Sequence, residues 1–352
     1  MQVRAALRGL AAPAFLGVLP LALLAALFYA QYGSNEAVVA VDFHNVFYPA
    51  AENVLEGISP YVEVTDPRTA YVYTPLLAFL VTPFTVLPLG VAEVVAALLL
   101  LACFVATPYV VGVRDWRVVG ALLLWPPFVS GLQTANVTFL LCLLCAFAWR
   151  WRDRSVLPGI AIGMAVALKM FLWPLAVWLL VTRRLASFAM ATLVAVIAVL
   201  LVLPFETLGV FVSMLREHGE LFDGESYTVY AFLAGLGVPD VTAHAVWLGV
   251  GFGVLVFGRR SFSLCVAAAL VLSPIVWLHY FALLVVPLAI AAAPLWVWLL
   301  PLLLWVVPGM ANGDSWQQAL VLGVTAVTIL LCVRPVSGSA HPLRRSELGV
   351  PS

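Results

Sequence analysis

Residues 91–113 read VAEVVAALLLLACFVATPYVVGV, and Arg114 and Arg117 follow this run closely. A run of this length and apolarity can cross the hydrocarbon core of a bilayer, roughly 30 Å thick, as a single helix. The whole chain shares this character: 64% of its 352 residues are hydrophobic and 10% are charged, against about 25% charged residues in a soluble domain. The sequence therefore predicts an all-α polytopic membrane protein. A formal net charge of +0 offers no basic face for nucleic acid.

The positive-inside rule sets the direction in which each apolar run crosses the membrane. A first run, ending near Tyr29, follows a basic N-terminus that we expect to lie in the cytoplasm. Arg114 and Arg117 are also cytoplasmic if the apolar segment Pro75–Leu89 lies on the outer surface or dips into it without crossing. Both termini are then cytoplasmic. The prediction is about 12 transmembrane helices, the first before residue 30 and the others at 91–113, 117–130, 136–149, 156–169, 170–182, 186–204, 242–258, 261–277, 279–292, 294–308 and 316–333.

Two polar segments on the outer side are long enough to carry function. They cover residues 31–90 and 205–241 and contain most of the acidic residues. We expect residues 1–333 to form a single transmembrane domain. The remaining residues, 334–352, are predicted to be a short, disordered cytoplasmic tail.

The first outer segment contains a predicted amphipathic helix. Apolar residues recur at helical spacing between Phe43 and Ile58, and polar residues occupy the opposite face. Such a helix lies at a membrane surface, and Gly57 and Pro60 are expected to end it. Asp42 precedes the helix. It either caps the free N–H groups there or holds a carboxylate over a cavity at the lipid–water boundary, and the two roles are compatible.

Several short motifs occur in an order that resembles one family of membrane enzymes. They are Val41-Asp42-Phe43 with Tyr48-x-Ala50-Ala51, Leu55-x-Gly57-x-x-Pro60-Tyr61, Tyr73-x-Pro75-Leu76, Pro126-Pro127, Gly131-x-x-Thr134-Ala135-Asn136, Ala167-Leu168-Lys169-x-x-x-x-Pro174 and Leu272-Ser273-Pro274-Ile275-Val276-Trp277-x-His279-Tyr280. Over residues 38–290 the chain thereby resembles glycosyltransferase family 87. These are polyprenyl-phosphate-sugar-dependent transferases of the GT-C type, best known as actinobacterial α-mannosyltransferases. The chain departs from the family's Gly-Gln-x-Asn at Gly131 to Asn136, and from its Tyr-Pro-Pro at Tyr73-Thr74-Pro75.

The resemblance implies a GT-C-type bundle that transfers a sugar, with mannose as the first expectation, from a polyprenyl monophosphate donor to a hydroxyl of a lipid or glycan acceptor. It also implies that transfer occurs on the extracytoplasmic side of the cell membrane, in cell envelope biosynthesis, and inverts the anomeric carbon. This chemistry needs a general base beside the acceptor hydroxyl and a group that stabilises the leaving phosphate. Asp42 matches the family's first-loop acid and is the expected base.

Ten side chains are candidates for substrate binding. Lys169 is the single lysine of the chain. It either contacts the donor phosphate or extends to the outer surface, since a lysine at the bilayer centre costs roughly 2.5–3.5 kcal/mol. His279 either donates to the substrate or belongs to an interfacial aromatic belt. The other candidates are Tyr280, Tyr48, Tyr61 and Tyr73, then Gln133 and Asn136, which alternatively cap a turn, and Arg216 and His218, which alternatively form a solvated charge cluster.

No metal or cofactor is expected. The sequence has no Asp-x-Asp pair, no His or Cys spacing suited to a metal ion, and no glycine-rich phosphate loop. A polytopic transporter or flippase is the alternative function, because transporters also contain interrupted spans with embedded polar residues. A transporter buries several ionisable groups at mid-membrane, whereas here we expect only Lys169 to stand out within the apolar runs.

Overall fold

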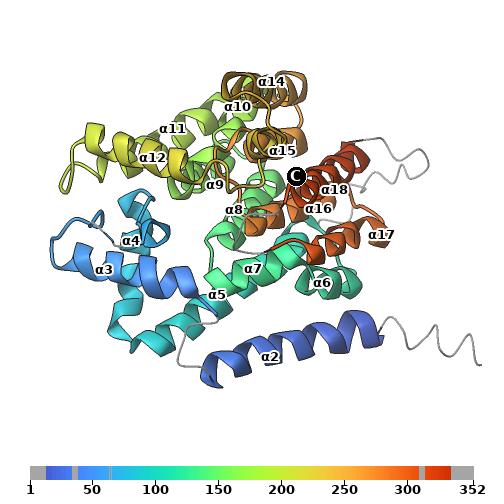
Figure 1. The fold of residues 1–352 in the computed structure, drawn as a ribbon, viewed down its shortest axis with the longest axis horizontal. Helices are drawn as coiled ribbons and strands as arrows, with labels where there is room; N and C mark the ends of the chain where they lie inside the picture. The colour runs from blue at the N-terminus through green and yellow to red at the C-terminus, as the bar shows by residue number, and fades with distance from the viewer. Residues whose placement is uncertain (1–12, 34–38, 63, 65, 309–313, 334–352) are drawn as a thin grey trace, which may run out of the picture.

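The computed structural model describes residues 13–33, 39–62, 64, 66–308 and 314–333. Every regular element within these ranges is a helix, which confirms the all-α prediction (Figure 1). The basic N-terminus and the predicted tail 334–352 lie outside the described residues.

Among the described residues, three helices are long and apolar enough to cross a bilayer alone: α5 (Leu89–Val111), α14 (Asp240–Gly258) and α18 (Ser315–Val333). At 1.5 Å per residue they extend about 28–35 Å. The other apolar helices have 10–17 residues. The structure therefore confirms an apolar helical bundle, while the figure of about twelve spans stays a prediction.

The shorter apolar elements make up most of that bundle. They are η1 (Ala14–Val18) with α2 (Leu19–Gly33), α9 (Leu157–Leu168), η5 (Met170–Leu172) with α10 (Pro174–Val181), α11 (Leu185–Leu200), α15 (Phe262–Leu272), η6 (Leu278–Leu284) with α16 (Val285–Ile290), and α17 (Leu295–Trp298) with η7 (Leu300–Val306).

The predicted span 117–130 is in fact two helices, α6 (Trp116–Leu123) and α7 (Pro126–Thr134). The two prolines that open α7 have no N–H to donate, so the preceding helix cannot continue through them. α7 then meets α8 (Thr138–Arg150) at an angle of 116°. Ala135 makes this bend by taking a left-handed conformation, with φ of 46°, directly after α7.

The predicted amphipathic helix of the first outer segment is present as η2 (Phe43–Phe47) and α3 (Tyr48–Leu55). Gly57, with φ of 72°, follows its end as predicted, because glycine adopts this conformation without steric cost. The apolar face of α3 packs against α4 (Pro75–Val81) and η4 (Thr82–Val86). These last two elements form most of the segment expected to stay on the outer surface, and each is too short to cross a bilayer.

The two outer segments lie at the same end of the molecule. The second contains α12 (Leu208–Phe222) and α13 (Val229–Gly235). Figure 1 shows α3, α4 and α12 together on the left, opposite the C-terminal helices α16, α17 and α18. Between them α7 packs against η6, and α9 packs against α8 and α11. The polar ends of these central helices therefore face the outer segments.

Candidate active site

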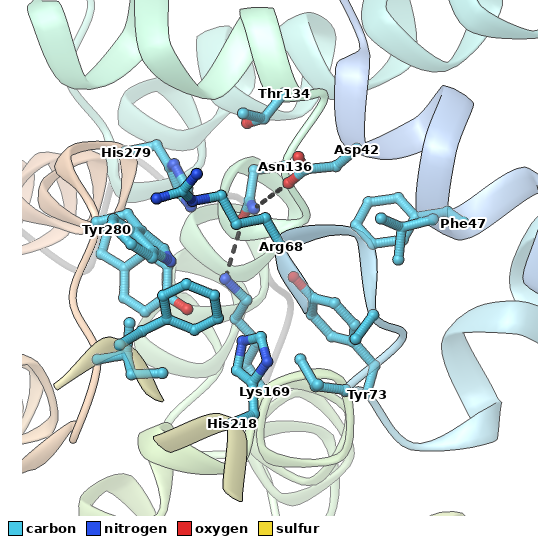
Figure 2. A pocket seen from close by; sticks show the side chains of 16 residues that line it. Asp42, Phe47, Arg68, Tyr73, Thr134, Asn136, Lys169, His218, His279 and Tyr280 are labelled. Atoms are coloured by element: carbon cyan, nitrogen blue, oxygen red, sulfur yellow. Dashed lines mark hydrogen bonds between the residues drawn. The ribbon is translucent and has the colours of Figure 1, made fainter. Parts of the chain in front are cut away.

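A cavity of about 160 Å³ lies where the first outer segment meets the ends of α7 and α9 and the start of η6 (Figure 2). The fold brings residues from distant parts of the sequence together here. Seven of the predicted site residues line the cavity: Asp42, Tyr73, Asn136, Lys169, His218, His279 and Tyr280.

Asn136 is held rigidly by the bend between α7 and α8. Its backbone N–H donates to the carbonyl of Gly131 at 2.9 Å. Its Oδ1 accepts from the backbone N–H of Thr138 at 3.1 Å and from the Thr138 hydroxyl at 2.7 Å. The side-chain amide is thereby oriented before any ligand arrives. Gly131 is required beside it, because a Cβ there would lie 2.6 Å from the ring of Phe139.

The Asn136 amide lies between a carboxylate and an ammonium group. Its Nδ2 donates to Oδ2 of Asp42 at 3.4 Å, and its Oδ1 accepts from Nζ of Lys169 at 3.1 Å. Figure 2 shows this row of three side chains with Asp42 and Lys169 on opposite sides of Asn136. The cavity therefore holds an acidic and a basic group that do not pair directly with each other.

Asp42 directly precedes η2, but its carboxylate makes no capping hydrogen bond. The capping interpretation of this residue is therefore wrong. Its place is fixed from the backbone, since Ala40, with φ of 67°, donates its N–H to the carbonyl of Leu132 at 3.2 Å. Burial raises the pKa of Asp42 to about 6, although the charge of Lys169 and the hydrogen bond from Asn136 both lower it.

Lys169 ends α9 and turns its side chain into the cavity. Only 7% of the residue is exposed, so its ammonium does not extend to the outer surface and that alternative is wrong. Nζ lies 3.7 Å from the ring centroid of Tyr280 and 5.6 Å from that of Tyr73. These aromatic faces and the Asn136 oxygen stabilise the buried cation.

His279 is buried in the cavity wall, with 3% of the residue exposed. Within the part of the chain that the structure describes, neither of its ring nitrogens has a hydrogen-bond partner. A buried polar group without a partner is costly in a native protein, and this one faces a space that a ligand can fill. His279 is therefore better suited to ligand binding than to an interfacial belt.

A second cavity, of about 320 Å³, adjoins the first. The two share several wall residues, among them Tyr73, Lys169 and Tyr280. Beyond these, the second cavity is lined mainly by apolar residues: Leu168, Met170, Phe171, Trp173, Leu215 and Leu272. Met170 and Trp173, in the wall of this cavity, are also exposed. Lys169 thus stands between a polar cavity and an apolar one.

Four predicted binding residues do not line either cavity. The Tyr48 hydroxyl donates to the carbonyl of Leu87 at 3.1 Å, and the Tyr61 hydroxyl donates to that of Tyr73 at 3.0 Å. Arg216 is exposed on α12, where its Nε lies 2.7 Å from Oε1 of Glu220. Gln133 is half-buried on α7. Their roles in binding remain predictions.

Arg68 is a cavity residue that the sequence analysis did not single out. It follows the N-cap of η3 (Pro67–Thr69), and it lines the first cavity beside Lys169 and His279. Its guanidinium lies 3.3 Å from the carboxylate of Glu225 and so connects the two outer segments. As an arginine in an acidic outer segment, Arg68 was visible in the sequence, but nothing there placed it at the cavity.

Glu93 corrects the expectation that Lys169 alone stands out among the apolar runs. It lies within α5 and is 5% exposed. Nδ1 of His44, on η2, contacts its carboxylate at 2.5 Å. The sequence could have indicated this residue, because Glu93 is the single charged residue in a run of 23.

The sequence that forms much of this cavity matches a known protein family. A family model described as "Glycosyltransferase family 87" matches residues 71–280, which is more than half of the chain. These residues include Asn136, Lys169 and His279, while Asp42 lies outside them. No solved structure matches the chain significantly. The chain belongs to glycosyltransferase family 87 and is a membrane glycosyltransferase.

Proposed function

We propose that the protein transfers a sugar from a polyprenyl monophosphate to a hydroxyl of a lipid or glycan acceptor, with inversion at the anomeric carbon. The observation that carries the proposal is the row Asp42–Asn136–Lys169 in a single cavity. It provides a carboxylate and an ammonium held apart by one oriented amide. A general base and a cationic phosphate ligand are the two groups that this transfer requires.

Asp42 serves as the general base in this mechanism. As the acceptor oxygen bonds to the anomeric carbon, its proton passes to the Asp42 carboxylate. The bond from the anomeric carbon to the phosphate oxygen breaks, and its electron pair leaves with the phosphate. A pKa of about 6 leaves the carboxylate largely ionised at pH 7 and makes it a stronger base than an exposed aspartate.

Lys169 and His279 receive the leaving phosphate. Lys169 interacts with phosphate as a point charge, and the protonated one of the two unpartnered ring nitrogens of His279 can donate to a phosphate or sugar oxygen. Both groups lie in the cavity that contains Asp42. The charge that develops on the phosphate is thereby stabilised in a site largely withdrawn from water.

The apolar second cavity suits the polyprenyl chain of the donor. It shares Lys169 with the first cavity, and exposed Met170 and Trp173 form part of its wall. A lipid phosphate bound at Lys169 can thus direct its sugar toward Asp42 and its chain toward the bilayer. This division favours a lipid-linked donor over a soluble nucleotide sugar.

The cavity lies on the extracytoplasmic side in this proposal. The placement follows from Arg114, between α5 and α6, and Arg117, in the first turn of α6, which the positive-inside rule assigns to the cytoplasm. The GT-C-type arrangement of about 12 spans in the plasma membrane belongs to the same proposal. It counts helices that are too short to span alone unless they pair end to end or the bilayer thins around them. Mannose is the sugar to test first.

A panel of radiolabelled donors tests the function. Membranes that contain the protein, and matched membranes without it, are incubated with polyprenyl-phosphate mannose, glucose and arabinofuranose, and labelled products are separated and identified. We expect one labelled lipid or glycan that depends on the protein and on a lipid-linked donor. Label transfer from nucleotide sugars after the membrane pool of polyprenyl phosphate has been removed would contradict the proposal.

A further inference from the structure

The segment that carries Asp42 is fastened to α5 by a contact outside the cavity. His44, on η2, places Nδ1 2.5 Å from Oε1 of Glu93. Glu93 is almost fully buried, and neither residue lines a cavity described above. A buried carboxylate in an apolar helix is costly unless it is paired. The carboxyl group of Glu93 therefore needs His44 as a partner, and breaking the contact would destabilise this part of the protein.

The contact acts on Asp42 through a very short stretch of backbone. Residues two apart on a helical segment point to nearly opposite sides, so Asp42 faces Asn136 while His44 faces α5. η2 is a π-helix, a rare form that is frequently found at functional sites. A shift of the His44 anchor would move the Asp42 carboxylate with it.

We propose that the His44–Glu93 pair positions Asp42 for catalysis. The pair holds η2 from the side facing α5, while the backbone contact of Ala40 with Leu132 holds the residues before it. Neither His44 nor Glu93 touches substrate in this proposal, so both are positioning residues. The inference rests on the proposed role of Asp42 as the general base.

Two variants distinguish a role in positioning Asp42 from a role in protein stability alone. Glu93→Asp keeps a carboxyl group at this position but withdraws it from His44 by one methylene, whereas Glu93→Met with His44→Leu removes both polar groups and retains packing. Removing both partners of a buried pair is often neutral or stabilising. Thr107→Val is the matched control, because it removes a buried hydroxyl of α5 that bonds only to Cys103 of the same helix.

Initial rates are measured for each purified variant with the labelled donor panel above, and thermal unfolding is measured on the same samples. We expect turnover to fall by about 10-fold or more in Glu93→Asp and by about 10²-fold in the double variant. Donor KM should stay within about 3-fold of the wild type, and unfolding temperatures should be nearly unchanged. Thr107→Val should retain full turnover.

The outcomes distinguish this inference from the proposed function. Wild-type turnover in a folded double variant, or in Glu93→Asp if the double variant fails to fold, would overturn the positioning role. Asp42→Asn is assayed in parallel. If Asp42→Asn is inactive while both Glu93 variants are fully active, only the inference fails. If Asp42→Asn is active, the base assignment and the inference fail together.

Discussion

Replacing Lys169 by methionine tests the proposed phosphate site most sharply. Methionine fills a similar volume but carries no charge. Two unit charges about 4 Å apart interact by about 4 kcal/mol at an effective dielectric constant near 20. In the proposed site His279 and the Asn136 amide still face the phosphate, so the net loss should be closer to that of one hydrogen bond to a charged group, about 1.5–3 kcal/mol. We therefore expect kcat/KM for the donor to fall about 10- to 10²-fold.

The protein itself should tolerate this change. Asn136 Oδ1 keeps both donors from Thr138, so no buried acceptor loses all of its partners. Lys169 does not pair directly with Asp42, and its removal also removes the cost of burying an ammonium group in the cavity wall. Lys169→Met should then unfold at the wild-type temperature or slightly above it, and Lys169→Arg, which retains the charge in another shape, should keep partial activity.

The assay is initial rate against donor concentration in nanodiscs, with acceptor in excess. It should be run at several pH values between about 6 and 8, because Lys169 lowers the pKa of Asp42 and its removal will raise that pKa. A fall in apparent donor affinity indicates that the charge binds the ground state, and a fall in turnover indicates that it acts as the phosphate leaves. Unchanged donor kinetics in folded Lys169→Met would refute the assignment.

Three further predictions follow from the cavity and the topology. Because Asp42 is a base only when ionised and its pKa is about 6, the transfer rate should rise with pH between about 5 and 7 and then level off; a rate that falls over this range would argue against Asp42. His279→Leu should leave stability unchanged, since no hydrogen bond of His279 is lost, but lower turnover about 10-fold or more; equal turnover would remove His279 from the site. Asp115→Cys in a cysteine-free protein should resist an impermeant outer thiol reagent, and labelling there would reverse the predicted topology.

Much of the bundle could be predicted because apolar runs and prolines act locally. The runs gave helices near their expected positions, including α5 and α18. The break before α7 was also readable in principle, since two consecutive prolines cannot continue a helix. The number of separate spans could not be derived, because a helix of 10–17 residues can pair, tilt or turn back, and its length alone does not decide which.

The cavity was predicted in part because short motifs carried its polar residues. The motifs identified Asn136, Lys169 and His279, and these residues do lie together. They did not show side-chain direction, so Tyr48 and Tyr61 entered the same list although their hydroxyls bond to backbone carbonyls. Contacts between remote segments, such as that of His44 with Glu93, have no local pattern and required the fold.

The proposed role of Asp42 as the general base is tested most directly by product formation in Asp42→Asn. The asparagine Oδ1 can still accept the hydrogen bond from Asn136, and the carboxylate caps no helix, so the variant should fold and bind donor. It cannot take up the acceptor proton, and general base catalysis contributes about 10²–10⁴-fold. We expect label transfer to fall by at least about 10²-fold, while labelled donor binds as in the wild type. Turnover near the wild-type rate in a folded Asp42→Asn protein would contradict it.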